Sequence, residues 1–218
     1  MKKAILLAIG LTYFISGFGQ ESEKLLNENE AWVGFTLKKE VSDRVVLSFD
    51  QQTRTMDDLN GIRAHLLELG LKYKLSKHFS LKGQYRYTLR NNMKNTDRIS
   101  LDLTTKWKYK PAKLTFKYRV RFQNTVVSYT DQNITYLRNR LSLQYKISKK
   151  WNIYTEYESF FKFNEKNEFR GNRYSFGAKY KVTKRIVLNA FYQLDQEINV
   201  KSPSRQNVYG LLLQWNLK

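Results

Sequence analysis

The sequence of 218 residues contains no cysteine. Disulfides, thiolate nucleophiles, zinc–thiolate sites and a lipid-modified N-terminal cysteine are therefore excluded. Histidine is limited to two residues, which do not lie at metal-ligand spacing, so we expect no metal site. Beyond the first nineteen residues no stretch approaches 18 consecutive apolar residues, and we expect no transmembrane helix there.

The first nineteen residues, MKKAILLAIGLTYFISGFG, have the pattern of a secretory signal peptide. Two lysines precede an apolar stretch, and Gly17 and Gly19 occupy the −3 and −1 positions of a cut before Gln20. A membrane anchor helix is the alternative, but the apolar stretch is shorter than the ~20 residues that span a bilayer. We predict that residues 1–19 are removed by cleavage near Gly19.

A motif recurs every 35–36 residues along the remaining chain. Tyr-Lys-x-Ser/Thr-Lys begins at Tyr73, Tyr145 and Tyr180, and Tyr109 begins an altered copy with Pro111 and Ala112. A period of this length indicates repeated supersecondary units. Each copy joins two runs of alternating residues, so the unit is a strand, a tight turn, a strand and a looser loop.

Eleven such runs are readable. We expect strands near 31–39, 44–54, 63–75, 79–90, 98–109, 113–126, 134–147, 151–163, 169–182, 186–197 and 207–217. The looser joints contain Asn, Asp, Gly and Pro, as at 57–61 and 202–204. One end of the sheet is therefore expected to have short turns and the other longer polar loops, as in bacterial outer-membrane barrels.

The two faces of each strand differ sharply. In residues 114–123, LTFKYRVRFQ, the first, third, fifth, seventh and ninth residues are apolar or aromatic, and the others include Lys117, Arg119 and Arg121. A soluble sandwich could bury such an apolar face. However, the aromatic residues of that face gather at the short-turn end, as a membrane interface requires and a core does not. They are Tyr73, Trp107, Tyr109, Tyr145, Trp151, Tyr180 and Trp215.

The sequence thus predicts an all-β protein, a transmembrane antiparallel up-and-down outer-membrane β-barrel of 10–12 strands. Residues 31–218 would form the barrel and residues 20–30 an N-terminal spacer. Bacterial barrels usually have an even number of strands. Either residues 31–39 stay out of the wall, which leaves ten strands, or residues 20–30 contain a short twelfth.

The inward face carries the candidate functional residues. Positive charge dominates the sequence, with 39 Lys and Arg against 19 Asp and Glu. Basic residues concentrate on strands 79–147 and most acidic residues on 44–75 and 151–197, so closure should bring two opposite arcs face to face. Either a structural salt-bridge network fills the lumen, or a basic track serves anionic solutes. The lumen-lining candidates are Arg86, Lys117, Arg119, Arg121, Arg138, Arg140, Glu156, Glu158, Arg173 and Asp195.

The charge also raises the question of nucleic-acid binding. A stacking platform needs aromatic and basic residues on one face, whereas here they lie on opposite faces of exported strands. We therefore expect no nucleic-acid partner. The expected partners are outer-membrane lipid and lipopolysaccharide, the barrel-assembly machinery, and small anionic solutes.

Several segments resemble a known family. These are Trp32, KYKLSKHFSLKGQYRY, YRVRFQ, YLRNRLSLQYKISKKW and FRGNRYSFGAKY. Together they are similar to the uncharacterised outer-membrane family called domain of unknown function 2490 (DUF2490), over nearly all of residues 31–218. The resemblance implies an outer-membrane barrel and implies no substrate and no catalytic residues. The chain departs from common outer-membrane strands in lacking a C-terminal aromatic residue.

Some barrels are lipid-modifying enzymes or proteases, with a histidine beside Ser, Asp or Glu. His65 lies seven residues beyond Asp58, and His78 lies in a short turn. This spacing is unspecific, and we predict no catalytic residues and no cofactor. The favoured function is a narrow basic-lumen pore or binder for small anions. The alternatives are a structural or surface-interaction barrel without conductance, and a His65-dependent membrane enzyme.

Overall fold

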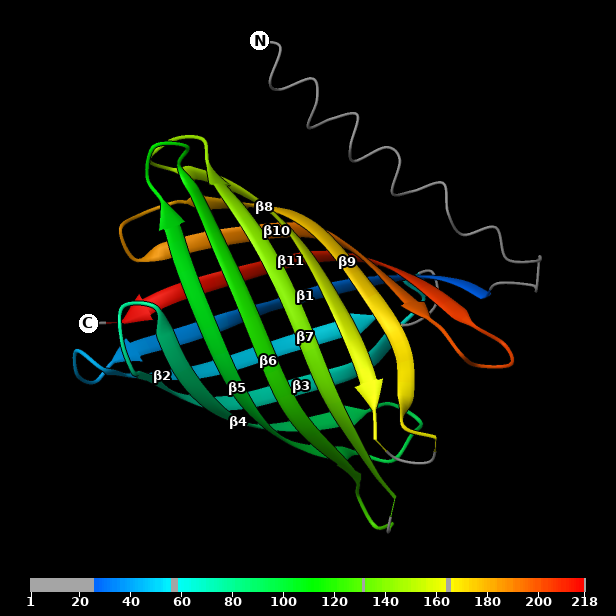
Figure 1. The fold of residues 1–218 in the computed structure, drawn as a ribbon. Coiled ribbons are helices and arrows are strands. Elements are labelled where there is room, and N and C mark those ends of the chain that lie inside the picture. Colours follow the sequence, from blue (N-terminus) through cyan, green and yellow to red (C-terminus); the bar gives the residue numbers. More distant parts are fainter. Residues whose placement is uncertain (1–25, 56–58, 131, 164–165, 218) are drawn as a thin grey trace.

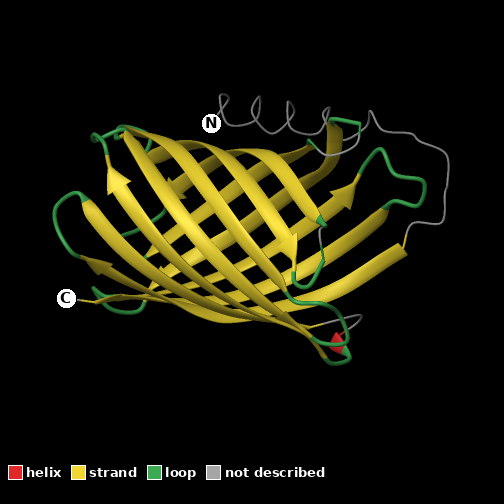
Figure 2. Cartoon of the chain, turned by 90° about the horizontal axis from the view of Figure 1, so that it is seen from below, coloured by secondary structure: helices red, strands yellow, loops and turns green. Residues whose placement is uncertain are grey.

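The computed structural model describes residues 26–55, 59–130, 132–163 and 166–217, and these form one closed β-barrel (Figure 1). The predicted signal peptide, 1–19, lies outside the described residues. Strands make up almost all of the described chain (Figure 2). They are β1 (Leu26–Glu40), β2 (Val45–Thr55), β3 (Ile62–Lys74), β4 (Phe79–Arg90), β5 (Thr96–Tyr109), β6 (Leu114–Val127), β7 (Asn133–Lys146), β8 (Trp151–Lys162), β9 (Glu168–Lys181), β10 (Ile186–Glu197) and β11 (Ser204–Leu217).

The barrel closes with an odd number of strands. Strands β1 to β11 follow one another around the wall in chain order, each antiparallel to the next. The first and last strands then pair in parallel, from Leu26 opposite Ser204 to Lys39 opposite Leu217. The expectation of an all-β barrel is confirmed, but the expectation of purely antiparallel pairing is wrong at this seam. The described barrel therefore has eleven strands and not ten or twelve, because the parallel pairing of β1 with β11 closes the wall.

The wall begins earlier than predicted. Strand β1 starts at Leu26, so residues 26–30 belong to the barrel and not to the predicted spacer of 20–30. The acidic composition of this segment argues against lipid contact, but Glu30 points inward and is 2% exposed. Among the described residues, no helix has the length and apolar character needed to cross a membrane.

Five tight turns span 41–44, 75–78, 110–113, 147–150 and 182–185, and the recurring motif forms all of them but the first. In four of these turns the second residue is Ser or Thr, and its side-chain oxygen accepts two backbone N–H groups. For example, Ser148 Oγ accepts from Lys150 N and Trp151 N at 3.2 and 3.0 Å. Ser42, Ser76 and Thr183 make the same pair of bonds. Serine and threonine favour turns because of such local bonds.

The altered copy of the motif forms a different turn. Pro111 and Ala112 offer no side-chain acceptor, and Lys113 instead takes a positive φ of 56° while its N–H bonds to Lys110 O at 3.0 Å. The connections at the opposite end span 56–61, 91–95, 128–132, 163–167 and 198–203. They exceed the turns by only one or two residues, so the two ends differ less in length than expected.

The two faces of the wall are as predicted. The outward residues Leu101, Leu141 and Leu211 are 51%, 57% and 45% exposed, whereas inward Glu68, Asp102 and Arg121 are 5%, 4% and 6% exposed. The large apolar side chains thus cover the outside, and the buried side chains inside are mostly polar. This inverted distribution is that of a transmembrane barrel.

Candidate functional site in the barrel lumen

The middle of the lumen is filled by side chains. Buried inward residues come from strands all around the wall, including Glu30 of β1, Glu68 of β3, Glu158 of β8 and Gln193 of β10. Because these groups have almost no contact with water, no wide aqueous channel runs through this level. Lumen packing of this kind is expected when the strand number is well below that of 16-stranded porins.

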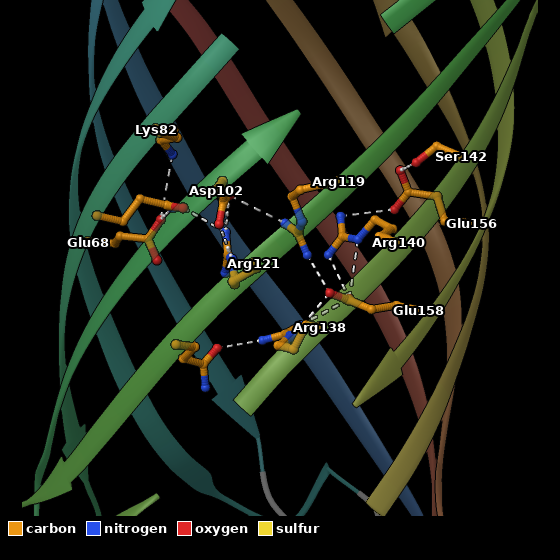
Figure 3. A network of polar contacts seen from close by, with 12 residues as sticks. Glu68, Lys82, Asp102, Arg119, Arg121, Arg138, Arg140, Ser142, Glu156 and Glu158 are labelled. Atoms are coloured by element: carbon orange, nitrogen blue, oxygen red, sulfur yellow. Dashed lines mark hydrogen bonds and ion pairs between the residues drawn. The ribbon is translucent and has the colours of Figure 1, made fainter. Parts of the chain in front are cut away.

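Glu158 lies at the centre of the largest ion-pair cluster (Figure 3). This carboxylate is 1% exposed and accepts from Arg138 Nε and Nη2, each at 3.0 Å, and from Arg140 Nη2 at 2.9 Å. Arg119 reaches the same carboxylate from β6. Arg140 also contacts Glu156 at 3.2 Å. Three guanidinium groups thus share one buried carboxylate, which leaves this cluster with excess positive charge.

A second cluster lies on the neighbouring strands (Figure 3). Arg121 of β6 donates to both oxygens of Asp102 on β5 and, at 2.6 Å, to Gln84 Oε1 on β4. Gln84 in turn donates to Glu68. Glu68 also forms an ion pair with Arg86 at 2.7 Å. Arg119 lies 3.8 Å from Asp102 and so joins this cluster to that of Glu158.

Aromatic rings complete the packed level. Arg173 pairs with Asp195 through bonds of 2.7 and 2.5 Å, and its guanidinium lies 5.2 Å from the Phe160 ring. Arg54 lies over the Trp32 ring at 3.7 Å. Arginine–aromatic contacts of this kind stabilise desolvated guanidinium groups. Sequence reasoning assigned aromatic residues only to the lipid face and did not assign Trp32 or Phe160 to either face, although their inward parity was a signal that would have located them here.

The ion pairs do not join two opposite arcs. Most of them connect adjacent strands, since Glu68 pairs with Arg86 between β3 and β4, and Arg173 pairs with Asp195 between β9 and β10. The prediction of basic and acidic arcs meeting across the lumen is therefore wrong. Cross-strand neighbours are about 4.5–5.5 Å apart, so a carboxylate reaches its neighbour before it reaches the far wall. Asp50, a further inward carboxylate, accepts from Thr36 Oγ1 at 2.5 Å.

Lys117 differs from the other lumen candidates. It is half-buried and, within the described part of the chain, forms no ion pair. The same holds for four further inward lysines nearer the short turns than the ion-pair clusters, which sequence reasoning did not single out: Lys38, Lys72, Lys106 and Lys179. Their inward parity was the available signal.

Among the described residues, neither histidine is brought together with an acidic group. The His65 ring Nδ1 lies 3.0 Å from Thr53 Oγ1 on the neighbouring strand, and Asp58, its suggested partner, lies outside the described residues. His78 Nδ1 lies 3.0 Å from the backbone oxygen of Lys106. Neither contact is an acid–base pair of the kind that activates a nucleophile.

These features define a class of protein: a closed β-barrel with an apolar outer wall and an interior of paired polar groups. A solved structure supports this fold. The NanC porin, determined in a rhombohedral crystal form, superimposes with a TM-score of 0.51 and 12% sequence identity, covering 73% of this chain and 78% of the porin.

The family follows from the sequence itself. The model of the family described as protein of unknown function DUF2490 matches residues 29–207, and the chain belongs to this family. The resemblance noted in the sequence is thereby confirmed. No curated protein matches the chain.

Proposed function

We propose that this protein is a bacterial outer-membrane barrel that takes small anionic solutes into a narrow basic lumen. After removal of residues 1–19 the apolar wall would contact outer-membrane lipid and lipopolysaccharide, with the barrel-assembly machinery inserting the chain. The similarity to the NanC porin fold supports a barrel that handles solutes.

The excess of positive charge in the lumen carries this proposal. Within the ion-pair clusters, cations outnumber carboxylates, as the three arginines on Glu158 illustrate. The five lysines nearer the turns add charge without adding carboxylates. Fixed positive charge in a low-dielectric conduit attracts anions and repels cations.

The filled middle of the lumen favours one alternative, a structural barrel without conductance. Glu30, Asp102 and Glu158 are too well packed for a solute to pass without rearrangement. Passage in our proposal is therefore slow and confined to small anions, and the arginine–carboxylate network is the constriction that limits it.

Planar-bilayer recordings test the proposal. The arginines are poor targets, because reversing them would leave buried carboxylates unpaired. The lysines Lys106 and Lys117 are better, since both lack ion pairs among the described residues. Wild type should give small anion-selective steps, and the Lys106→Glu/Lys117→Glu variant should lose that selectivity, while Lys149→Glu in an exposed turn should not. Cation-selective steps, or no steps from correctly folded wild type, would contradict the proposal.

A further inference from the structure

Five inward lysines without an ion pair among the described residues form a ring around the lumen, and one of them, Lys38, donates a hydrogen bond to Gln214 Oε1 at 2.6 Å. Each lies two or three residues from the short-turn end of its strand, and the strands are β1, β3, β5, β6 and β9. Within the described residues, none of them has a carboxylate within ion-pair distance. The lysine ring consists of Lys38, Lys72, Lys106, Lys117 and Lys179.

The members of the ring face one another. Lys106 and Lys117 are direct register partners on β5 and β6. Across the lumen, Lys117 lies within electrostatic range of Lys179 and Lys72, and Lys38 lies within range of Lys117. The ring is thus one region of repulsive positive charge and not a set of independent surface lysines.

Neighbouring carboxylates neutralise this region only in part. Asp50, which faces Lys38, is bonded to Thr36. Glu156, which faces Lys117 and Lys179, accepts from Ser142 Oγ at 2.8 Å and pairs with Arg140. The five ammonium groups outnumber these two carboxylates, one of which Arg140 already shares, so a mobile anion would balance the remaining charge.

Two glycines let other side chains pack closely against the wall at this level. A Cβ atom at Gly177 would lie 2.6 Å from the Tyr154 ring, so glycine lets that ring lie flat against β9, under the Lys179 ammonium at 4.7 Å. A Cβ atom at Gly70 would lie 2.5 Å from Lys82 Cε. The ring lysines keep part of their surface exposed, whereas Glu158 and Arg138 of the packed level are buried. The ring lysines are therefore more accessible to a solute than the packed level is.

We propose that the lysine ring binds a compact multivalent oxyanion, namely a phosphate or diphosphate group. An ammonium is a compact charge with three rotatable donors, so several of them can converge on tetrahedral oxygens from different directions. A planar carboxylate is instead matched by a guanidinium, and the ring contains no arginine. The inference rests on the proposed use of anions by this lumen and adds the chemical class and the location of the site.

Titration calorimetry of the detergent-solubilised barrel with inorganic pyrophosphate tests the ring directly. Wild type should bind one pyrophosphate per chain. The Lys117→Gln/Lys179→Gln variant should bind at least about tenfold more weakly, because two charge-assisted hydrogen bonds to the anion are lost. The matched control Lys149→Gln/Lys184→Gln removes two turn lysines and should bind like wild type. Unchanged mobility of the unboiled protein on a gel shows that each variant is folded.

Other anions separate the remaining outcomes. If the barrel binds glycerol phosphate as well as pyrophosphate, the site accepts phosphorylated solutes. If it binds pyrophosphate alone, the site accepts the free inorganic ion. Citrate binding as tightly as pyrophosphate, no pyrophosphate binding, or equal binding by the ring variant would overturn the inference. Calorimetry measures binding without any current. Pyrophosphate binding without conductance would refute the proposed pore but not the proposed site. Conductance without pyrophosphate binding would refute the proposed site but not the pore.

Discussion

Arg121 and Asp102 face each other on neighbouring strands and form a two-point ion pair, with Nε–Oδ1 and Nη2–Oδ2 distances of 2.6 and 2.7 Å. Both side chains are buried, at 6% and 4% exposure. Breaking such a pair from one side leaves an uncompensated charge, which is more costly than removing both partners. The pair therefore determines how the lumen responds to mutation.

We expect Arg121→Met to lower the free energy of unfolding by about 3–5 kcal/mol. Asp102 would then retain only Arg119, at 3.8 Å. The double variant Arg121→Met/Asp102→Leu should recover much of this loss, and Lys149→Met in an exposed turn should change little. Urea unfolding in lipid vesicles measures all three. A single variant as stable as wild type would show that the pair is not structural.

The membrane-facing assignment predicts a contrast between two adjacent residues. Leu141→Arg places a charge on the outer wall, where Leu141 is 57% exposed, and should cost about 2–4 kcal/mol if it lies near the bilayer midplane. Ser142→Arg places the same charge inside, beside Glu156, and should cost less. Comparable losses at both positions in the same unfolding assay would invalidate the assignment of faces.

Two glycines of the wall should respond oppositely to alanine. A Cβ atom at Gly34 would overlap the backbone oxygen of Gln51, so Gly34→Ala must displace the β1–β2 ladder. A Cβ atom at Gly83 meets nothing within 4 Å. Gly83→Ala should therefore be neutral or stabilise by about 0.4–1 kcal/mol, because alanine restricts the unfolded chain. Thermal unfolding of the two variants gives the comparison, and equal behaviour would count against this β1–β2 contact.

The seam can be tested by cross-linking, which the absence of native cysteine makes unambiguous. Phe35 and Leu213 are register partners across β1 and β11 and both point outward. Phe35→Cys/Leu213→Cys should form a disulfide under mild oxidation, because neighbouring strands bring Cα atoms within the 4.4–6.8 Å that a disulfide needs. Phe35→Cys/Tyr209→Cys, offset by about 13 Å along β11, should not. A ten-stranded wall without β1 would give neither product.

The non-enzyme prediction concerns His65, whose contact among the described groups is the Thr53 hydroxyl. We expect lipid A mass profiles to be unchanged when the gene is deleted. An altered profile that wild type restores and His65→Ala does not would instead establish a catalytic histidine.

Much of the fold could be predicted from alternation alone. A period of two identifies a strand and its faces, and Ser148 and Thr183 mark turns because their side chains bond to the local backbone. Alternation does not identify the partner of an edge strand. The parallel seam and the early start of β1 at Leu26 were therefore missed.

The sequence predicts which residues line the lumen, but it does not predict which of them pair with each other. Inward parity places Arg138, Arg140 and Glu158 on one surface, as the structure shows. Which carboxylate meets which arginine depends on the cross-strand register, and the sequence contains no measure of that register. Trp32 shows a different limit, because its residue type suggests the membrane interface although its parity in β1 places it inside, under Arg54.

The odd strand count also decides the sidedness of the chain. Strand β1 begins at Leu26 at the loop end of the barrel, and β11 ends at Leu217 at the turn end, where the arrowheads of both strands lie in Figure 1. An even count would return both ends to one side. In a membrane, the residue entering the first strand and the residue leaving the last would face different compartments. An epitope tag fused after Leu217 and a tag inserted before Leu26 should accordingly be reached by antibodies from opposite sides.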